Sequence, residues 1–209
     1  MDFSKVTPGP VVAEFFGTFT LALVVLASIW GVLPLVPTAI LAGLTLGLFV
    51  LSVGHASGAN LNPAITLGLY SLKKLDSAHA VSFISAQLSG ALVAMVVMSL
   101  FLEGELVSRV TVNADYKTFF AEFLGALLFG FGVASAVAQK FNGVNAALLV
   151  GGSLSLGIVL ASLGSTGVLN PAVATSIGSL NWSYALGPIL GAIIGMNVYA
   201  MSFGKKGRL

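Results

Sequence analysis

A four-residue motif able to hold a neutral oxygen atom occurs twice in the chain, as Leu61-Asn62-Pro63-Ala64 and as Leu169-Asn170-Pro171-Ala172. Asn is a favoured helix N-cap and Pro is favoured at the first helical position, so each motif predicts the start of a helix. A capping Asn accepts a first-turn N–H with its side-chain oxygen, which leaves its NH₂ group to donate. Two such donors that face one point can hold the oxygen of one water or hydroxyl group.

The apolar stretches after these motifs are too short to cross a membrane. Pro63 to Leu72 and Pro171 to Leu180 each run for ten residues, or about 15 Å of helix, which is half of the hydrocarbon thickness. Backbone that turns back at mid-depth is tolerated only where it is buried in protein or lines a water-filled cavity. We therefore expect two half-helices at a pore or transport site. Their dipoles put about half a positive charge at each N-terminus, which repels cations and protons.

Two carboxylates lie inside apolar runs, Glu14 in Ala13-Glu14-Phe15-Phe16-Gly17 and Glu122 in Ala121-Glu122-Phe123-Leu124-Gly125. Such carboxylates are costly in a membrane and usually functional. A structural ion pair is one interpretation, although no basic residue lies inside an apolar run, and a proton relay is another. His55, seven residues before Asn62, is either a satisfied core residue or a pore-lining one.

The composition requires a membrane protein. Of the 209 residues, 57% are hydrophobic and only 8% are charged, whereas soluble proteins carry about 25% charged residues. The 25 Gly residues point to close helix packing in lipid. Cys is absent, which excludes disulfides and Cys-ligated metals, and a net charge of +2 does not indicate nucleic-acid binding. We expect an all-α membrane fold.

Apolar runs between polar or Pro/Gly breaks predict six transmembrane helices, near residues 11–30, 38–56, 78–102, 118–139, 145–163 and 183–203. Six spans of about 20 residues and two half-helices use nearly the whole chain. We therefore expect a single domain over residues 1–209. Small residues at four-residue spacing, such as Gly187, Gly191 and Gly195 in the last span, allow close backbone approach.

The chain also contains an internal repeat. Glu14 and Glu122 are 108 residues apart, and so are Asn62 and Asn170. Each unit, about 8–102 and 116–203, holds three spans, and because that number is odd the second unit should be inverted relative to the first. Inverted repeats with broken helices place their site near the midplane, where the units meet. The two half-helices should therefore enter from opposite faces and meet at their N-termini.

The basic residues predict the orientation. If the spans alternate, seven fall on one side, namely Lys5, Lys73, Lys74, Lys140, Lys205, Lys206 and Arg208. Arg109 and Lys117 fall on the other. The positive-inside rule then puts both termini in the cytoplasm, and the absence of a basic n-region with a cleavage site predicts no removable signal peptide. We expect an integral protein of the plasma (inner) membrane.

The chain resembles the aquaporin and glycerol-facilitator channels, also called major intrinsic proteins, over essentially its whole length. Besides the two glutamates, the likeness is carried by His55-Ala56-Ser57-Gly58-Ala59-Asn60-Leu61-Asn62-Pro63-Ala64-Ile65-Thr66, Ala86-Gln87-Leu88-Ser89-Gly90 and Thr166-Gly167-Val168-Leu169-Asn170-Pro171-Ala172. The resemblance implies six transmembrane helices plus two re-entrant half-helices, in an inverted repeat. It also implies a homotetramer in which each subunit passively conducts water or small neutral solutes. Glu14 and Glu122 would accept hydrogen bonds from the re-entrant loops, and His55 would line the cytoplasmic side of the pore.

The selectivity filter that this resemblance implies departs from the family pattern. Family members usually carry Arg directly after the second Asn-Pro-Ala, where this chain has Val173. The other filter positions correspond to Ala42 in the second span, to Ile158, Val159 or Leu160 in the fifth, and to Gly167 or Val168 in the second re-entrant loop. All are small or aliphatic, so the filter lacks the fixed charge and the five N–H donors of arginine.

We expect a wide, apolar outer mouth that admits water and small neutral solutes, with glycerol, urea, ammonia and undissociated small acids as candidates. The subtype markers conflict, since Ala174 replaces the Asp of glycerol facilitators while Tyr184 is closer to the water-channel type. The alternatives are a strict water channel, a secondary transporter and a closed junction protein. His55 and Ser57 make a poor nucleophile–base pair, so we expect no enzyme activity, and neither a cofactor nor a metal.

Overall fold

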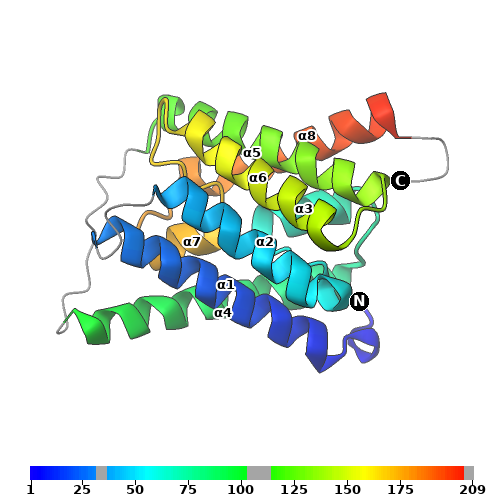
Figure 1. Cartoon of the computed structure of the whole chain (residues 1–209), viewed down its shortest axis with the longest axis horizontal. Coiled ribbons are helices and arrows are strands. Elements are labelled where there is room, and N and C mark those ends of the chain that lie inside the picture. The colour runs from blue at the N-terminus through cyan, green and yellow to red at the C-terminus, as the bar shows by residue number, and fades with distance from the viewer. Residues whose placement is uncertain (32–36, 103–113, 205–209) are drawn as a thin grey trace.

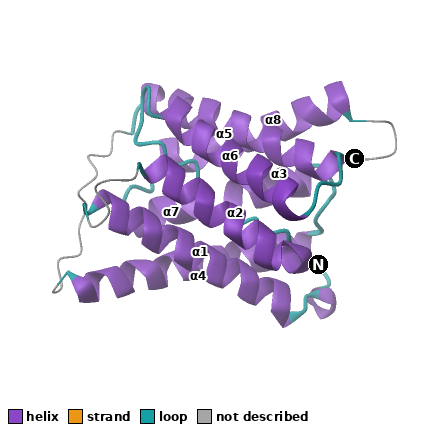
Figure 2. Ribbon diagram, in the orientation of Figure 1, coloured by secondary structure: helices purple, strands orange, loops and turns teal. Residues whose placement is uncertain are grey.

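The structure, a computed structural model, describes residues 1–31, 37–102 and 114–204, and within these ranges every regular element is a helix (Figure 2). Six of the helices are long and apolar enough to cross a membrane: α1 (Pro8–Ile29), α2 (Thr38–Ser57), α4 (Ser77–Phe101), α5 (Tyr116–Ala138), α6 (Gly143–Ala161) and α8 (Trp182–Phe203). Each begins and ends within three residues of its predicted bounds. The predicted all-α membrane fold is therefore confirmed.

Two short helices follow the Asn-Pro-Ala motifs, α3 (Pro63–Ser71) and α7 (Pro171–Ser176). The predicted ten-residue length is nearly right for α3 but wrong for α7, which has six residues. The physical reason is an early left-handed residue, Gly178 (φ 69°), after which Ser179 N–H donates to Ala174 O at 2.9 Å and closes the helix end. After α3 the same closure occurs later, around Lys73 (φ 58°).

The long helices run in the directions that an inverted repeat requires. In Figure 1, α1 and α4 run from right to left, whereas α5 and α8 run from left to right. The first residues of the chain and the end of α8 lie at the same end of the bundle. The boundaries of the two units, about 8–102 and 116–203, stay a prediction.

Glycines bring the helix backbones into contact. A Cβ on Gly90 of α4 would overlap the carbonyl oxygen of Phe15 in α1, and one on Gly191 of α8 would overlap that of Phe123 in α5. One turn further along α8, Gly195 packs in the same way on Leu127. The predicted small-residue face of the last span therefore lies against α5, with each glycine facing backbone rather than a flexible side chain.

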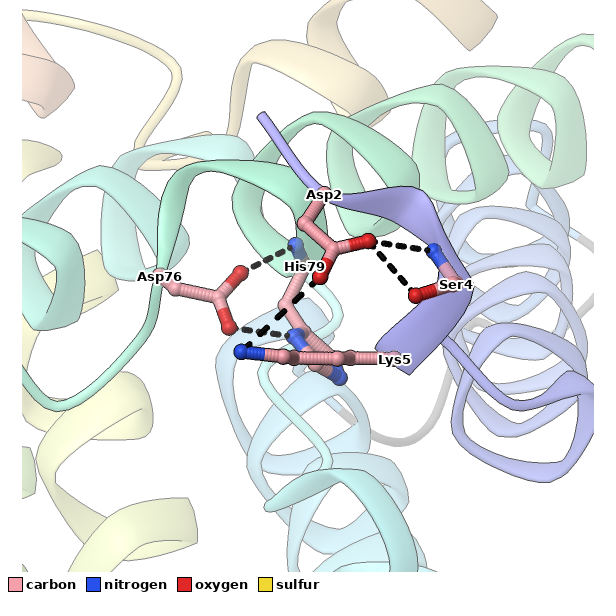
Figure 3. A network of polar contacts seen from close by, with 5 residues as sticks. All are labelled: Asp2, Ser4, Lys5, Asp76 and His79. Carbon is pink, nitrogen blue, oxygen red and sulfur yellow. Dashed lines mark hydrogen bonds and ion pairs between the residues drawn. The ribbon is translucent and has the colours of Figure 1, made fainter.

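A short 3-10 helix, η1 (Phe3–Lys5), precedes α1 and lies beside the start of α4 (Figure 3). There Asp76 caps α4 by accepting the backbone N–H of His79 at 2.9 Å, and it also lies 3.0 Å from His79 Nδ1. These contacts favour the charged carboxylate, the backbone hydrogen bond most, and so lower the pKa of Asp76. Asp115 caps α5 through Thr118 N–H at 2.7 Å, which lowers the pKa of Asp115 likewise.

Candidate pore site

The two asparagines of the repeated motif cap the two half-helices, as the sequence predicts. Asn62 Oδ1 accepts the backbone N–H of Ala64 at 2.8 Å. Asn170 Oδ1 accepts that of Ala172 at 3.0 Å and a longer one from Val173 at 3.4 Å. In each motif Pro occupies the first turn, where no N–H is needed. Local sequence alone therefore fixes both helix starts.

The amide nitrogens of these asparagines bond across the interface between the two halves. Asn62 Nδ2 donates to the carbonyl oxygen of Leu169, and Asn170 Nδ2 donates to that of Leu61, each at 2.8 Å. The sequence predicts that each NH₂ group is left to donate into the lumen, but in the structure one N–H of each amide already has a partner in the opposite loop. A primary amide has two N–H groups, so each asparagine keeps one donor beyond its bond to the opposite loop.

A buried carboxylate organises the first re-entrant loop. Glu14 is fully buried in α1 and accepts four hydrogen bonds. Its Oε1 accepts Ser57 Oγ at 2.7 Å and Asn60 N–H at 2.9 Å, and its Oε2 accepts Leu61 N–H at 2.8 Å and Gln87 Nε2 at 2.7 Å. Among the described residues Glu14 forms no ion pair, so backbone N–H groups and neutral side chains satisfy this carboxylate instead of a basic partner.

The second loop repeats the arrangement with one donor fewer. Glu122 is fully buried in α5. It accepts Ser165 Oγ at 2.6 Å and Val168 N–H at 2.9 Å on Oε1, and Leu169 N–H at 2.6 Å on Oε2. The two glutamates thus hold the residues that lead into the two Asn-Pro-Ala motifs.

These contacts keep two leucines in a backbone conformation that leucine rarely adopts. Leu61 has φ 51° and Leu169 has φ 55°, both in the left-handed region. That conformation directs each N–H to a glutamate and each carbonyl to the opposite asparagine. Gly17 and Gly125, three residues after the glutamates, give the leucine side chains room, because a Cβ at either position would overlap them.

A cavity of about 430 Å³ lies beside the second loop, at the end of the bundle where α2 begins. All the residues chosen as filter candidates except Val159 and Leu160 line it, namely Ala42, Ile158, Gly167, Val168 and Val173. Asn170 lines it as well. Of the three fifth-span alternatives, Ile158 faces the cavity, whereas the Val159 residue is 58% exposed. The described lining contains no charged and no aromatic side chain.

A second cavity, of about 330 Å³, lies at the opposite end of the bundle, where α2 ends. His55, in the last turn of α2, lines this cavity together with Asn60 and residues of α5 and α6. Ser57 does not pair with His55. Its hydroxyl donates to Glu14 and accepts Ala59 N–H at 3.0 Å, so it serves the loop and not a nucleophile–base pair.

The sequence does not assign the contacts of several side chains that the structure places at the site. Gln87 donates to Glu14 and to Thr66 Oγ1, the latter at 2.9 Å. The Tyr184 hydroxyl contacts Thr166 in the second loop. Gln87 and Thr166 lie in the segments that carry the family resemblance, which is the signal that points to them. Their partners lie on other helices, so spacing along the chain does not assign their contacts.

Comparisons with known proteins agree with this geometry. A family model described as Major intrinsic protein matches residues 4–199. Aquaporin NIP6-1 of Arabidopsis thaliana is 32% identical over 205 residues, with 90% of this chain and 67% of that protein covered. Nodulin-26 of Glycine max is 27% identical, with 90% and 76% covered. The X-ray structure of the aquaglyceroporin from Plasmodium falciparum matches with a TM-score of 0.70 at 19% identity, over 94% of this chain and 95% of that one.

Six spans and two re-entrant half-helices that meet at their N-termini define an integral membrane protein of the aquaporin fold. The chain belongs to the major intrinsic protein family, whose members are passive channels and not enzymes. It spans about two thirds of the length of the plant aquaporins NIP6-1 and NIP3-1 that it matches.

Proposed function

We propose that this channel conducts water and small uncharged solutes passively, through a pore with a wide, apolar outer mouth. The observation that carries the proposal is the pair of cavities at opposite ends of α2, on either side of Asn62 and Asn170, whose amides donate to Leu169 and Leu61. We interpret them as the two vestibules of one pore, with Asn62 and Asn170 between them. We call the cavity of about 430 Å³ beside the second loop the outer cavity. It is large enough for a solute of several non-hydrogen atoms, since one water occupies about 30 Å³ in the liquid.

The character of the outer cavity favours neutral over charged solutes. An ion that enters it leaves water for a lining of aliphatic side chains, and desolvating an unpaired charge is strongly unfavourable. A neutral solute loses only a few hydrogen bonds, which carbonyls and amides of the second loop replace in part, and its carbon atoms contact Ile158 and Val173. The names of two similar proteins, an aquaporin and an aquaglyceroporin, agree with water and a small polyol as solutes.

We assign the midpoint to Asn62 and Asn170 and the inner vestibule to His55. With Val173 in the outer filter, proton exclusion rests on the midpoint, where two amides remain as donors and two helix N-termini meet. A proteoliposome loaded with a pH-sensitive dye tests this assignment. A proton flux indistinguishable from that of protein-free vesicles is expected, and a large leak would show that the midpoint alone is insufficient.

We further propose that the channel is a homotetramer of the plasma (inner) membrane with both termini in the cytoplasm. The family resemblance supports the assembly. Lys5 precedes α1, Lys73 lies between α3 and α4, and Lys140 follows α5; these helix ends lie at one end of the bundle, whereas Lys117 is in the first turn of α5, at the other end. This distribution supports the orientation. Lys205, Lys206, Arg208 and Arg109 contribute to the same prediction but lie outside the described residues.

Stopped-flow light scattering of proteoliposomes tests the proposed function. Wild-type vesicles should shrink and refill faster than protein-free vesicles in gradients of glycerol, urea and an ammonium salt as well as in an impermeant osmolyte. The rates should not depend on an imposed proton or sodium gradient, which a secondary transporter would require. Fast water flux without solute flux would favour the strict water channel, and absence of any flux would overturn the open-channel proposal.

A further inference from the structure

One polar pair beside the outer cavity, Tyr184 and Thr166, has been given no role so far. Tyr184, in the first turn of α8, is 2% exposed, and its hydroxyl oxygen lies 2.9 Å from Thr166 Oγ1. The backbone N–H of Thr166 donates to the same hydroxyl oxygen at 3.3 Å. Thr166 itself is exposed and lines the outer cavity. A buried side chain therefore holds, at two atoms, a residue that faces the permeation path.

The position of the shared proton follows from counting donors. The Tyr184 hydroxyl has one hydrogen, and Thr166 is the partner that the structure gives it among the described residues. If Thr166 donated to Tyr184, the phenol hydrogen would be left without an acceptor at a buried site, which is unfavourable. Donation from Tyr184 to Thr166 Oγ1 is the arrangement that satisfies both hydroxyl groups, and it leaves the Thr166 hydroxyl hydrogen free to point into the cavity.

Few other side chains can donate there. Besides Asn170, the side chains in the described lining that carry a hydroxyl or amide are Thr166 and Thr38. Thr38 lies in the first turn of α2, where its Oγ1 is 2.6 Å from Ser28 Oγ and either hydroxyl can donate. Thr166 belongs to the second re-entrant loop, so in a filter without arginine its hydroxyl is the side-chain donor of that loop, besides Asn170, that lines the cavity.

The loop around Thr166 is held firmly enough to fix this donor. Ser165 on its N-terminal side bonds to Glu122, and Gly167 N–H donates back to Ser165 Oγ at 2.9 Å. The position 108 residues earlier is Gly58, which has no side chain, so the first half of the chain has no counterpart. The pair is a feature of the outer half alone.

We propose that Tyr184 is a specificity-determining positioning residue, which orients the Thr166 hydroxyl to donate a hydrogen bond to an acceptor oxygen of the solute in the outer cavity. The inference rests on the proposed function and adds to it a recognition element. It selects solutes with a carbonyl or hydroxyl oxygen, such as urea or a polyol, over solutes of similar size without one. Water, which can donate and accept in several orientations, depends less on a single fixed donor.

The test compares solute permeability with water permeability in proteoliposomes of four single variants. Tyr184→Phe removes the phenol oxygen at nearly constant volume, Thr166→Val removes the donor, and Thr166→Ser retains it. Tyr199→Phe is the matched control, because Tyr199 is also a buried tyrosine of α8 and the described structure gives its hydroxyl no hydrogen bond. Loss of one hydrogen bond worth about 1 kcal/mol should lower the ratio of urea or glycerol permeability to water permeability about fivefold.

We expect that fall in Tyr184→Phe and in Thr166→Val, and wild-type ratios in Thr166→Ser and Tyr199→Phe. A fifth protein that combines Tyr184→Phe with Thr166→Val should show no further fall. An unchanged ratio in Thr166→Val, in a channel that still conducts, would overturn the inference and leave the proposed function intact. A change in Thr166→Val without one in Tyr184→Phe would overturn the positioning role of Tyr184. Because Thr166 is exposed, its variants keep the test valid if Tyr184→Phe does not fold.

Discussion

The same repeated residues supply both the helix caps and the contact between the two halves of the site. Asn62 and Asn170 use their oxygens locally and their nitrogens across the interface. The local half of this role was predictable, because capping preferences act within a few residues. The cross-bonds to Leu61 and Leu169 were not, because they depend on the fold bringing together segments more than 100 residues apart.

Replacing Glu14 with Gln should destabilise the channel. One carboxylate oxygen becomes an NH₂ group that faces two of the four present donors, so at least one buried donor loses its acceptor. The expected loss is about 1–3 kcal/mol, measured as a fall in melting temperature in detergent. Ser57→Ala, which removes one donor and leaves the carboxylate with three, should cost less. A Glu14→Gln protein as stable as wild type would contradict this account of the first loop.

At the scale of helices, the sequence predicts lengths well and partners poorly. The bounds of all six spans follow from hydropathy, which is a local property. The early end of α7 at Ser176 was not predicted, because it depends on the turn geometry at Gly178. The small-residue spacing of Gly187, Gly191 and Gly195 predicts a close contact, but nothing in it identifies α5 as the helix contacted.

A pair of glycine substitutions separates packing from helix propensity. In Gly191→Ala the new methyl group would overlap the Phe123 carbonyl and lie 3.0 Å from Leu127 N, so we expect a loss of about 1–3 kcal/mol. Gly152→Ala is the matched control, since Gly152 lies inside α6 with nothing within 4 Å of an added Cβ. It should be neutral or stabilising by up to about 1 kcal/mol. Equal effects of the two changes in thermal unfolding would refute the close packing of α8 on α5.

The helix cap at Asp76 gives a pH dependence with a definite sign. Because the pKa of Asp76 is lowered in the folded protein, its charged form stabilises the fold. That contribution is complete above the usual carboxyl pKa of about 3.9 and disappears as the pH falls through the lowered value. The melting-temperature advantage of wild type over Asp76→Asn should therefore be largest near neutral pH and shrink in acid. A gap that is constant with pH, or that grows in acid, would contradict this assignment.

At the scale of the whole molecule, orientation can be tested directly because the chain has no Cys. A Lys73→Cys substitution places one thiol at the end of the bundle where α4 begins, and a Lys117→Cys substitution places one at the opposite end, where α5 begins. In intact cells, a membrane-impermeant maleimide should label Lys117→Cys and spare Lys73→Cys until the membrane is permeabilised. The reverse pattern would place the termini outside, and labelling of both would show mixed insertion.

The family and the fold were predictable from the sequence, because the repeated motif identifies them. The wide outer mouth, predicted from Val173, stays a prediction. The size of each cavity and the pairing of Thr166 with Tyr184 were not predictable, since they depend on side chains from helices far apart in the chain. Which solutes pass depends on those contacts and therefore has to be measured.

The most direct test of the apolar filter is the glycerol and water permeability of Val173→Arg and Val173→Met in proteoliposomes. Arg adds a charge and five donors at the outer cavity, whereas Met adds length without either, so the pair distinguishes chemistry from narrowing. We predict that wild type conducts both solutes and that Val173→Arg loses glycerol flux at least about tenfold, equivalent to about 1.4 kcal/mol, while retaining water flux. Val173→Met should lose less glycerol flux. A wild-type channel that conducts water but excludes glycerol would contradict the account.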